Sequence, residues 1–193
     1  MLNPLLWLLG RIIRWGYGHY LMQTHEGIDL CDVAGAGKDK QFVVYTVRAL
    51  ELIKSSDPRR FRRLQRHFEC IVNLRLLTAA SYDKRLRICE LDFSRFYCTE
   101  DAESAILYLA AALVHEATHG AVCSRKISHD KKRRLRIERL CHREEARFIH
   151  RINPEVDLGA FDEAGYAAFY RTSRWRLAVD ALKYARKPNE PSA

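Results

Sequence analysis

A long apolar stretch of this chain runs directly into a histidine-containing sequence. Residues 105–114, Ala-Ile-Leu-Tyr-Leu-Ala-Ala-Ala-Leu-Val, contain no charged side chain. They are apolar nearly all round a helix, which predicts a helix buried inside a domain rather than one lying on its surface. Thr99 or Asp101 can cap the start of this helix, and Glu103 suits its first turn. The next five residues, 115–119, therefore lie on a buried element.

Composition indicates an ordinary globular protein with an unusual charge. A chain of 193 residues, 48% hydrophobic and 30% charged, can bury one core, so one domain is expected. The net charge of +9 favours acidic partners: nucleic acid, an anionic membrane surface or an acidic substrate. The six cysteines include no C-x-x-C pair, which is typical of reduced, buried thiols in an intracellular protein. We expect a cytoplasmic location.

The first 30 residues form a separate amphipathic segment in this interpretation. Trp7, Arg11, Arg14 and Trp15 suit a short helix that either packs on the core or lies on an anionic membrane surface through residues 1–20. Such a contact would make the protein peripherally membrane-associated. We expect residues 31–186 to form the single domain and residues 187–193 to be a flexible tail.

The remaining periodicities predict an α+β fold that is mainly α-helical. Apolar spacing indicates a helix over 42–53, and Asp57-Pro58 is typical of a cap and first turn that start a helix reaching about residue 72. Two short strands, 74–79 and 86–93, are expected to form a hairpin with residues 81–84 as its turn. A long charged helix follows over 131–152.

The sequence His115-Glu116-Ala117-Thr118-His119 is the signature H-E-x-x-H of zinc hydrolases. Residues four apart on a helix lie one above the other, so both imidazoles can reach one metal ion. Glu116 lies at the edge of that face, close enough to take a proton from a zinc-bound water. The signature needs a third ligand from elsewhere in the chain.

The helix over 131–152 offers the candidates for that third ligand. Glu138 follows His119 after eighteen intervening residues, and Glu145 lies two turns further along the same face. Two turns separate these carboxylates by roughly 10 Å, so both cannot bind one ion. Glu138 is the first candidate, Glu145 the second, and His142 the alternative that is not a carboxylate.

The motif and its spacing to Glu138 resemble the gluzincin class of zinc metallopeptidases. Residues 113–120 and 136–141, with Glu145, are also similar to small bacterial proteins of the metallopeptidase type. The resemblance implies a zincin-like domain, with a buried H-E-x-x-H helix, a following helix that bears a ligand and a short β-hairpin or sheet. The aminopeptidase motif Gly-x-Met-Glu-Asn is missing, so an aminopeptidase is not implied.

The resemblance implies a peptidase that binds Zn²⁺ through His115, His119 and Glu138, with Glu116 as the general base. Its substrate would be a peptide or protein. A neutral donor should stabilise the oxyanion, and the candidates are Tyr166, Tyr170, His142 and His150. The strand over 87–93 could accept a substrate strand by edge pairing.

The rival hypothesis assigns the function to positive charge. Arginines are dense over 59–66 and 125–139 and could neutralise the phosphates of a nucleic acid or the headgroups of an anionic membrane. The zinc site would then be structural or vestigial. No nucleic-acid-binding motif accompanies the arginines, which favours the peptidase.

Overall fold

The computed structural model describes residues 16–35, 40–76, 78–97, 101–125 and 131–156. Helices and one mixed sheet make up an α+β fold, as the sequence predicts. The sheet has five strands in the order β1-β2-β3-β5-β4. Their bounds are β1 Leu21–His25, β2 Ile28–Asp32, β3 Cys70–Asn73, β4 Ala80–Asp83 and β5 Ile88–Leu91. The helices that position the site are α2 Gln41–Ser56, α3 Pro58–His67, α4 Ser94–Tyr97, α5 Ala102–Ser124 and α6 Lys131–Ile152.

The helix starts that the sequence predicts are confirmed. Asp57 caps α3, because its side chain accepts a hydrogen bond from the backbone N–H of Arg60. Asp101 caps α5 in the same way through the N–H of Ser104. In both cases a side-chain oxygen satisfies an N–H group that has no partner within its own helix.

The segment between α3 and β5 differs from the prediction. The helix expected to reach residue 72 ends at His67, and the apolar residues that follow form β3, the central strand. The strand expected over 74–79 is wrong as well, since β4 occupies Ala80–Asp83, where a turn was expected. The true turn lies over 84–87, where the Asp83 carboxylate accepts backbone hydrogen bonds from Arg85 and Leu86. Arg87 completes it with a positive φ of 56°.

The sheet is parallel at its centre and antiparallel at its edges. β2, β3 and β5 run parallel, whereas β1 and β4 pair antiparallel with β2 and β5. β5 therefore has a neighbour on each side, so the strand over 87–93 cannot accept a substrate strand, and that expectation is wrong. Among the described strands, β4 is the edge strand on this side of the sheet.

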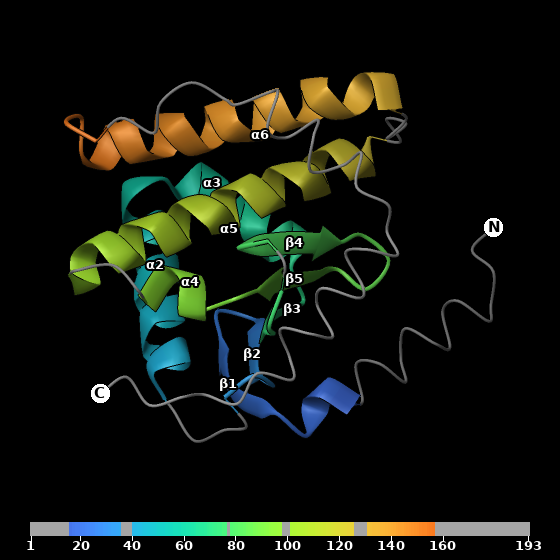
Figure 1. Cartoon of the computed structure of the whole chain (residues 1–193), viewed down its shortest axis with the longest axis vertical. Coiled ribbons are helices and arrows are strands. Elements are labelled where there is room, and N and C mark those ends of the chain that lie inside the picture. Colours follow the sequence, from blue (N-terminus) through green and yellow to red (C-terminus); the bar gives the residue numbers. More distant parts are fainter. Residues whose placement is uncertain (1–15, 36–39, 77, 98–100, 126–130, 157–193) are drawn as a thin grey trace, which may run out of the picture.

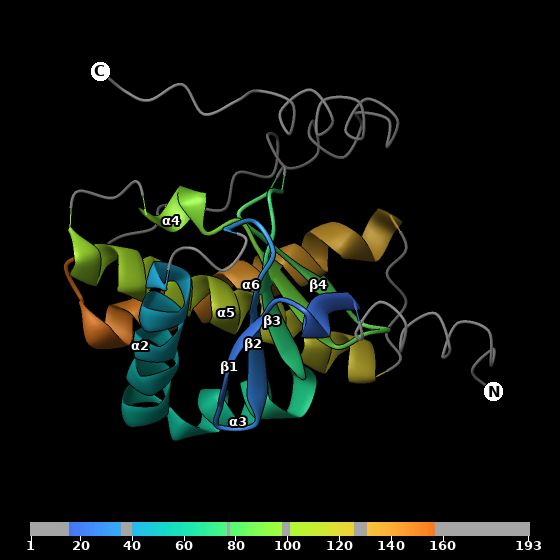
Figure 2. The same ribbon diagram turned by 90° about the horizontal axis from the view of Figure 1, so that it is seen from below.

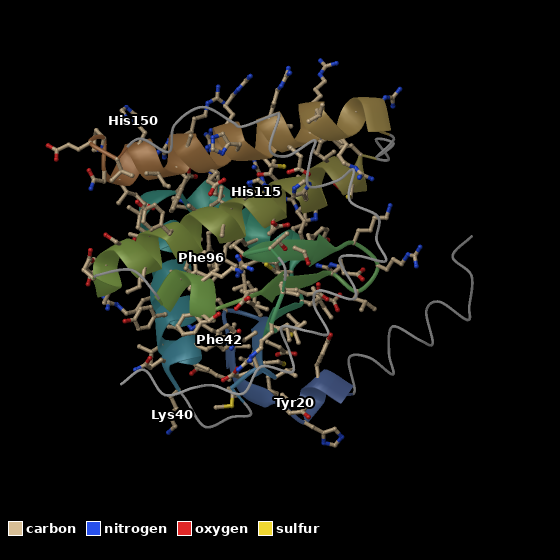
Figure 3. The ribbon with its side chains drawn as sticks, viewed as in Figure 1. Tyr20, Lys40, Phe42, Phe96, His115 and His150 are labelled. Atoms are coloured by element: carbon tan, nitrogen blue, oxygen red, sulfur yellow. The ribbon has the colours of Figure 1, made fainter. Side chains whose placement is uncertain are left out.

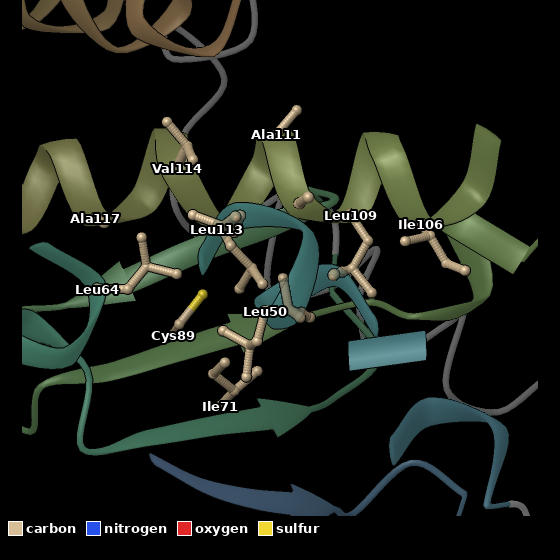
Figure 4. Packing of buried hydrophobic residues seen from close by; sticks show 14 of the residues in the cluster. Leu50, Leu64, Ile71, Cys89, Ile106, Leu109, Ala111, Leu113, Val114 and Ala117 are labelled. Atoms are coloured by element: carbon tan, nitrogen blue, oxygen red, sulfur yellow. The ribbon is translucent and has the colours of Figure 1, made fainter. Parts of the chain in front are cut away.

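Helix α5 is the centre of the molecule. Figures 1 and 2 show it between the sheet and α6, with α2 and α3 beside it. Figure 4 shows Leu109 and Leu113 pointing toward the side of the sheet, whereas Ala111 and Val114 point toward α6. All four side chains are at most 1% exposed. Within the described residues, α5 is long and apolar enough to cross a membrane, but 67% of that apolar window is buried in the protein.

Several predicted features lie outside the described residues. They are Thr99, the first half of the amphipathic amino-terminal segment (residues 1–15), the oxyanion candidates Tyr166 and Tyr170, and the tail over 187–193. Residues 21–32, on both sides of the boundary expected at residue 30, form two strands of the central sheet. The division of the chain into 1–30, 31–186 and 187–193 stays a prediction.

Gly120, directly after the second histidine, allows α5 to approach α3 closely. A Cβ atom added at this position would lie 2.7 Å from the Cβ of His67 and 2.8 Å from its Cγ. His67 is only 7% exposed, so its side chain has little room to move away. The absence of a side chain at Gly120 therefore determines how closely these two helices pack.

We expect Gly120→Ala to lower the free energy of unfolding by about 1–3 kcal/mol, because the added methyl group overpacks this contact. Chemical denaturation measures the change. Gly16→Ala is the matched control, since a Cβ there meets nothing within 4 Å. An unchanged or raised stability of Gly120→Ala would show that α3 and α5 can separate without cost.

A network of charged groups joins α3 to α5 and α6. Arg60 donates to Glu144 on α6 at 3.1 Å, and Arg63 lies 3.4 Å from the same carboxylate and 3.3 Å from the hydroxyl of Thr118 on α5. Arg147 donates to Glu144 from its own helix at 2.9 Å. Burial raises the pKa of Glu144, but the arginines outweigh it and hold the pKa below its ordinary value of 4.5.

This shift predicts a loss of stability in acid. A carboxyl group with a lowered pKa in the folded state stabilises it fully above pH 4.5 and loses that contribution as the pH falls through the folded value. We expect Glu144→Gln to be less stable than the wild type at neutral pH and to lose less stability between about pH 6 and pH 3.5. Melting temperatures across this range measure both effects, and parallel curves for the two proteins would contradict them.

Candidate metal centre

The candidate site lies in the seam between α5 and α6. His115 and His119 come from the second half of α5, and Glu138, Cys141 and Glu145 lie at positions of α6 that repeat every three or four residues. Since α6 turns back over α5, these two sets of side chains meet, and Figure 3 shows His115 between the two helices. The histidine and glutamate side chains are 13–21% exposed, so the seam is largely but not wholly closed to solvent.

Three side-chain atoms form a nearly equilateral triangle. His115 Nε2 and His119 Nε2 are 3.3 Å apart, and Glu138 Oε2 lies 3.5 Å from the first and 3.4 Å from the second. Tetrahedral zinc with bonds of 2.0–2.2 Å places neighbouring ligand atoms roughly 3.3–3.6 Å apart. The donor set and its spacing therefore fit zinc before any rearrangement of the side chains.

Cys141 is a member of this site that the sequence analysis missed. The donor atoms of His115, His119 and Cys141 all lie within 4.8 Å of one another, so these three residues form a group that can hold a metal ion. Cys141 is completely buried and follows Glu138 by three residues on the inner side of α6. That spacing was the available signal, but all six cysteines were interpreted as reduced, buried thiols.

Glu145 lies on the other nitrogen of His115. Its Oε2 is 2.9 Å from His115 Nδ1 and 3.6 Å from His142 Nδ1. A carboxylate that accepts from one ring nitrogen of a metal-binding histidine fixes the ring and leaves the other nitrogen to the metal. The structure therefore places Glu138 in the triangle with both histidines, and Glu145 behind His115.

The electrostatics of the seam favour a cation. Burial lowers the pKa of His115, but its contacts with Glu138 and Glu145 outweigh this and raise the pKa to about 10. Glu116 is 6% exposed, and burial raises its pKa although both histidines oppose the shift. Three carboxyl groups thus surround two imidazoles in a largely dry environment, where a bound divalent cation would compensate the charge of the carboxylates.

The oxyanion candidates are placed unequally. His142 lies beside Glu145 and therefore close to His115. His150 is exposed in the last turn of α6, away from His115 in Figure 3. Of the described candidates, His142 is therefore the one near the site.

Comparisons with protein families, with curated proteins and with solved structures found no match for this chain. We therefore infer the function from the geometry of the seam.

We expect the purified protein to bind one zinc ion per chain, because the triangle offers a single set of donors. His115→Ala and His119→Ala should abolish tight binding, and Glu138→Gln should weaken it far more than His150→Ala, the exposed control on the same helix. Competition with a chromophoric chelator measures each affinity. A wild-type protein without zinc affinity would contradict the assignment of a metal centre.

Binding of cobalt in place of zinc distinguishes whether Glu138 or Cys141 is the third ligand. A cobalt–thiolate bond gives an intense ultraviolet charge-transfer band, whereas nitrogen and oxygen ligands do not. We expect no such band, and little change in cobalt affinity in Cys141→Ser, because the Glu138 oxygen completes the triangle. A strong band that Cys141→Ser removes would assign the metal to His115, His119 and Cys141.

Proposed function

We propose that this protein is a zinc-dependent metallopeptidase that uses Glu116 as its general base. The observation that carries the proposal is the triangle of His115, His119 and Glu138, with Glu116 adjacent to the first histidine on a buried helix. A structural zinc site is closed by four protein ligands, whereas three leave a position for water and substrate. The partial exposure of the site residues supports such an open position.

Each residue of the site has a separate role in the proposed hydrolysis. Zinc, when bound, supplies Lewis acidity that acidifies a coordinated water and polarises a carbonyl group. Glu116 takes the proton of the attacking water and delivers it to the leaving nitrogen, which its buried position beside the histidines supports. Glu145 holds the ring of His115 so that Nε2 faces Glu138 and His119.

The edge of the sheet suggests how a peptide would bind. β4 packs beside α5, and among the described strands it pairs with β5 alone. An extended peptide can add to such an edge through backbone hydrogen bonds, which are independent of the peptide's sequence. In the proposed complex the substrate pairs with β4 as an additional strand of the sheet. Its scissile bond then faces the seam between α5 and α6. The missing aminopeptidase motif favours cleavage within a chain rather than at its amino terminus.

Glu116→Gln tests the catalytic role directly. We expect the variant to bind zinc as the wild type does and to lose hydrolysis of an unfolded protein substrate by about 10²–10⁴-fold, because the amide cannot accept the proton. Release of fluorescent peptides from a heavily labelled, unfolded protein measures the rate. Glu103→Gln changes an exposed glutamate on the same helix and should leave the rate unchanged.

If Glu145 orients His115, Glu145→Gln should weaken zinc binding without abolishing it. We expect its zinc affinity to fall about 10–100-fold, with activity restored at saturating zinc. The wild-type protein could bind zinc and yet cleave neither an unfolded protein nor a peptide library at any zinc content. That result would contradict the peptidase proposal and indicate a structural zinc site.

A further inference from the structure

The positive charge of this chain is concentrated on two neighbouring helices. Helix α6 carries nine lysines and arginines against three glutamates, and α3 carries five arginines and no carboxylate. Together they hold eleven net positive charges, whereas the whole chain has +9, so the remainder is slightly acidic. The basicity is thus a local property of the α3–α6 side of the molecule and not a general one.

On α6 the carboxylates are largely buried, whereas most of the arginines are exposed. Its three carboxylates, Glu138, Glu144 and Glu145, turn inward toward α5 and α3, with side chains 13–21% exposed. The exposed arginines of α6, which we name the arginine face, are Arg133, Arg136, Arg139, Arg143, Arg147 and Arg151. Figure 3 shows long nitrogen-tipped side chains on the side of α6 that faces away from α5.

In the sequence the arginines form dense runs over 59–66 and 125–139. In the structure they recur every three or four residues and lie along one side of a helix of 22 residues. Arg147 and Arg151 also contact Glu144 and Asp57, but no carboxylate of α6 is itself exposed. A row of this kind presents guanidinium groups, whose planar fork matches the oxygens of a phosphate group.

We propose that the arginine face binds the phosphate backbone of duplex nucleic acid without reading its sequence. The helix is about 33 Å long, close to the length of one turn of B-DNA, so several arginines can contact phosphates at once. No phenylalanine, tyrosine or tryptophan side chain of α6 is exposed, so His150 is the one exposed ring of this helix on which a single-stranded base could stack. Leu140, 40% exposed, is the one large apolar side chain exposed on α6, too little to insert into a membrane.

The arginine face and the metal centre occupy opposite sides of α6. Glu138, Cys141 and Glu145 face α5, so nucleic acid on the arginine face does not cover the seam. Nucleic-acid binding on the arginine face therefore needs no zinc, and the zinc site needs no nucleic acid.

Fluorescence anisotropy of the full-length protein with a labelled DNA duplex of about 20 base pairs, two turns of B-DNA, tests the proposal. We expect the duplex to bind at low salt. The logarithm of the association constant should then fall linearly with the logarithm of the salt concentration. The triple variant Arg136→Gln, Arg139→Gln and Arg143→Gln should weaken binding at least tenfold and reduce the salt slope by about 2–3. Duplexes of unrelated sequence should bind equally well, with or without zinc.

The matched control removes the same charge elsewhere. Arg48, Lys84 and Arg85 are exposed and lie outside α3 and α6, and their triple exchange to glutamine should leave the salt slope unchanged. Circular dichroism and zinc content confirm that both variants fold. An equal loss of duplex affinity in both triple variants would show that binding depends on net charge alone and would contradict the proposal. A wild-type protein that does not bind the duplex at low salt would also contradict it. Binding to phosphatidylserine vesicles but not to the duplex would also overturn it, in favour of a membrane.

Discussion

Helix α6 packs along α5, and this contact determines both the core and the candidate metal site. Helix α5 is apolar nearly all round, so the sheet can cover only one of its sides, and α6 must cover the other. The same contact brings Glu138 and Cys141 of α6 to the two histidines of α5. The contact between α5 and α6 thus buries the core helix, assembles the candidate metal site and leaves the arginines of α6 facing outward.

This seam contains groups that rarely lie together in a protein interior. Three carboxyl groups, two imidazoles and a thiol meet where little water reaches, and taking charges out of water costs several kcal/mol for each ion. The triangle of donor atoms offsets that cost if it holds a divalent cation. Arg60 and Arg63 contribute from the other side, because they tie Glu144 of α6 to α3 and so hold α6 in place.

The sequence predicted the parts of the fold that have strong, long periodicities. Helices α5 and α6, the caps Asp57 and Asp101 and the H-E-x-x-H motif could all be found from residue spacing alone. The segment after α3 could not, because a short apolar run such as Cys70–Val72 suits a buried strand as well as a helix. Likewise, spacing put Glu138 and Glu145 on one face, but only the three-dimensional arrangement distinguishes the carboxylate in the triangle from the one behind His115.

The local origin of the site has a consequence for the order of folding. Every residue of the candidate centre lies between positions 115 and 145, within one helical hairpin. The central sheet, by contrast, joins β2 to β3 across almost forty residues of intervening chain. Contacts that are close in sequence form faster than distant ones, so the hairpin can close before the sheet is complete. A metal ion present at that moment would fasten the hairpin and present a ready surface on which the strands assemble.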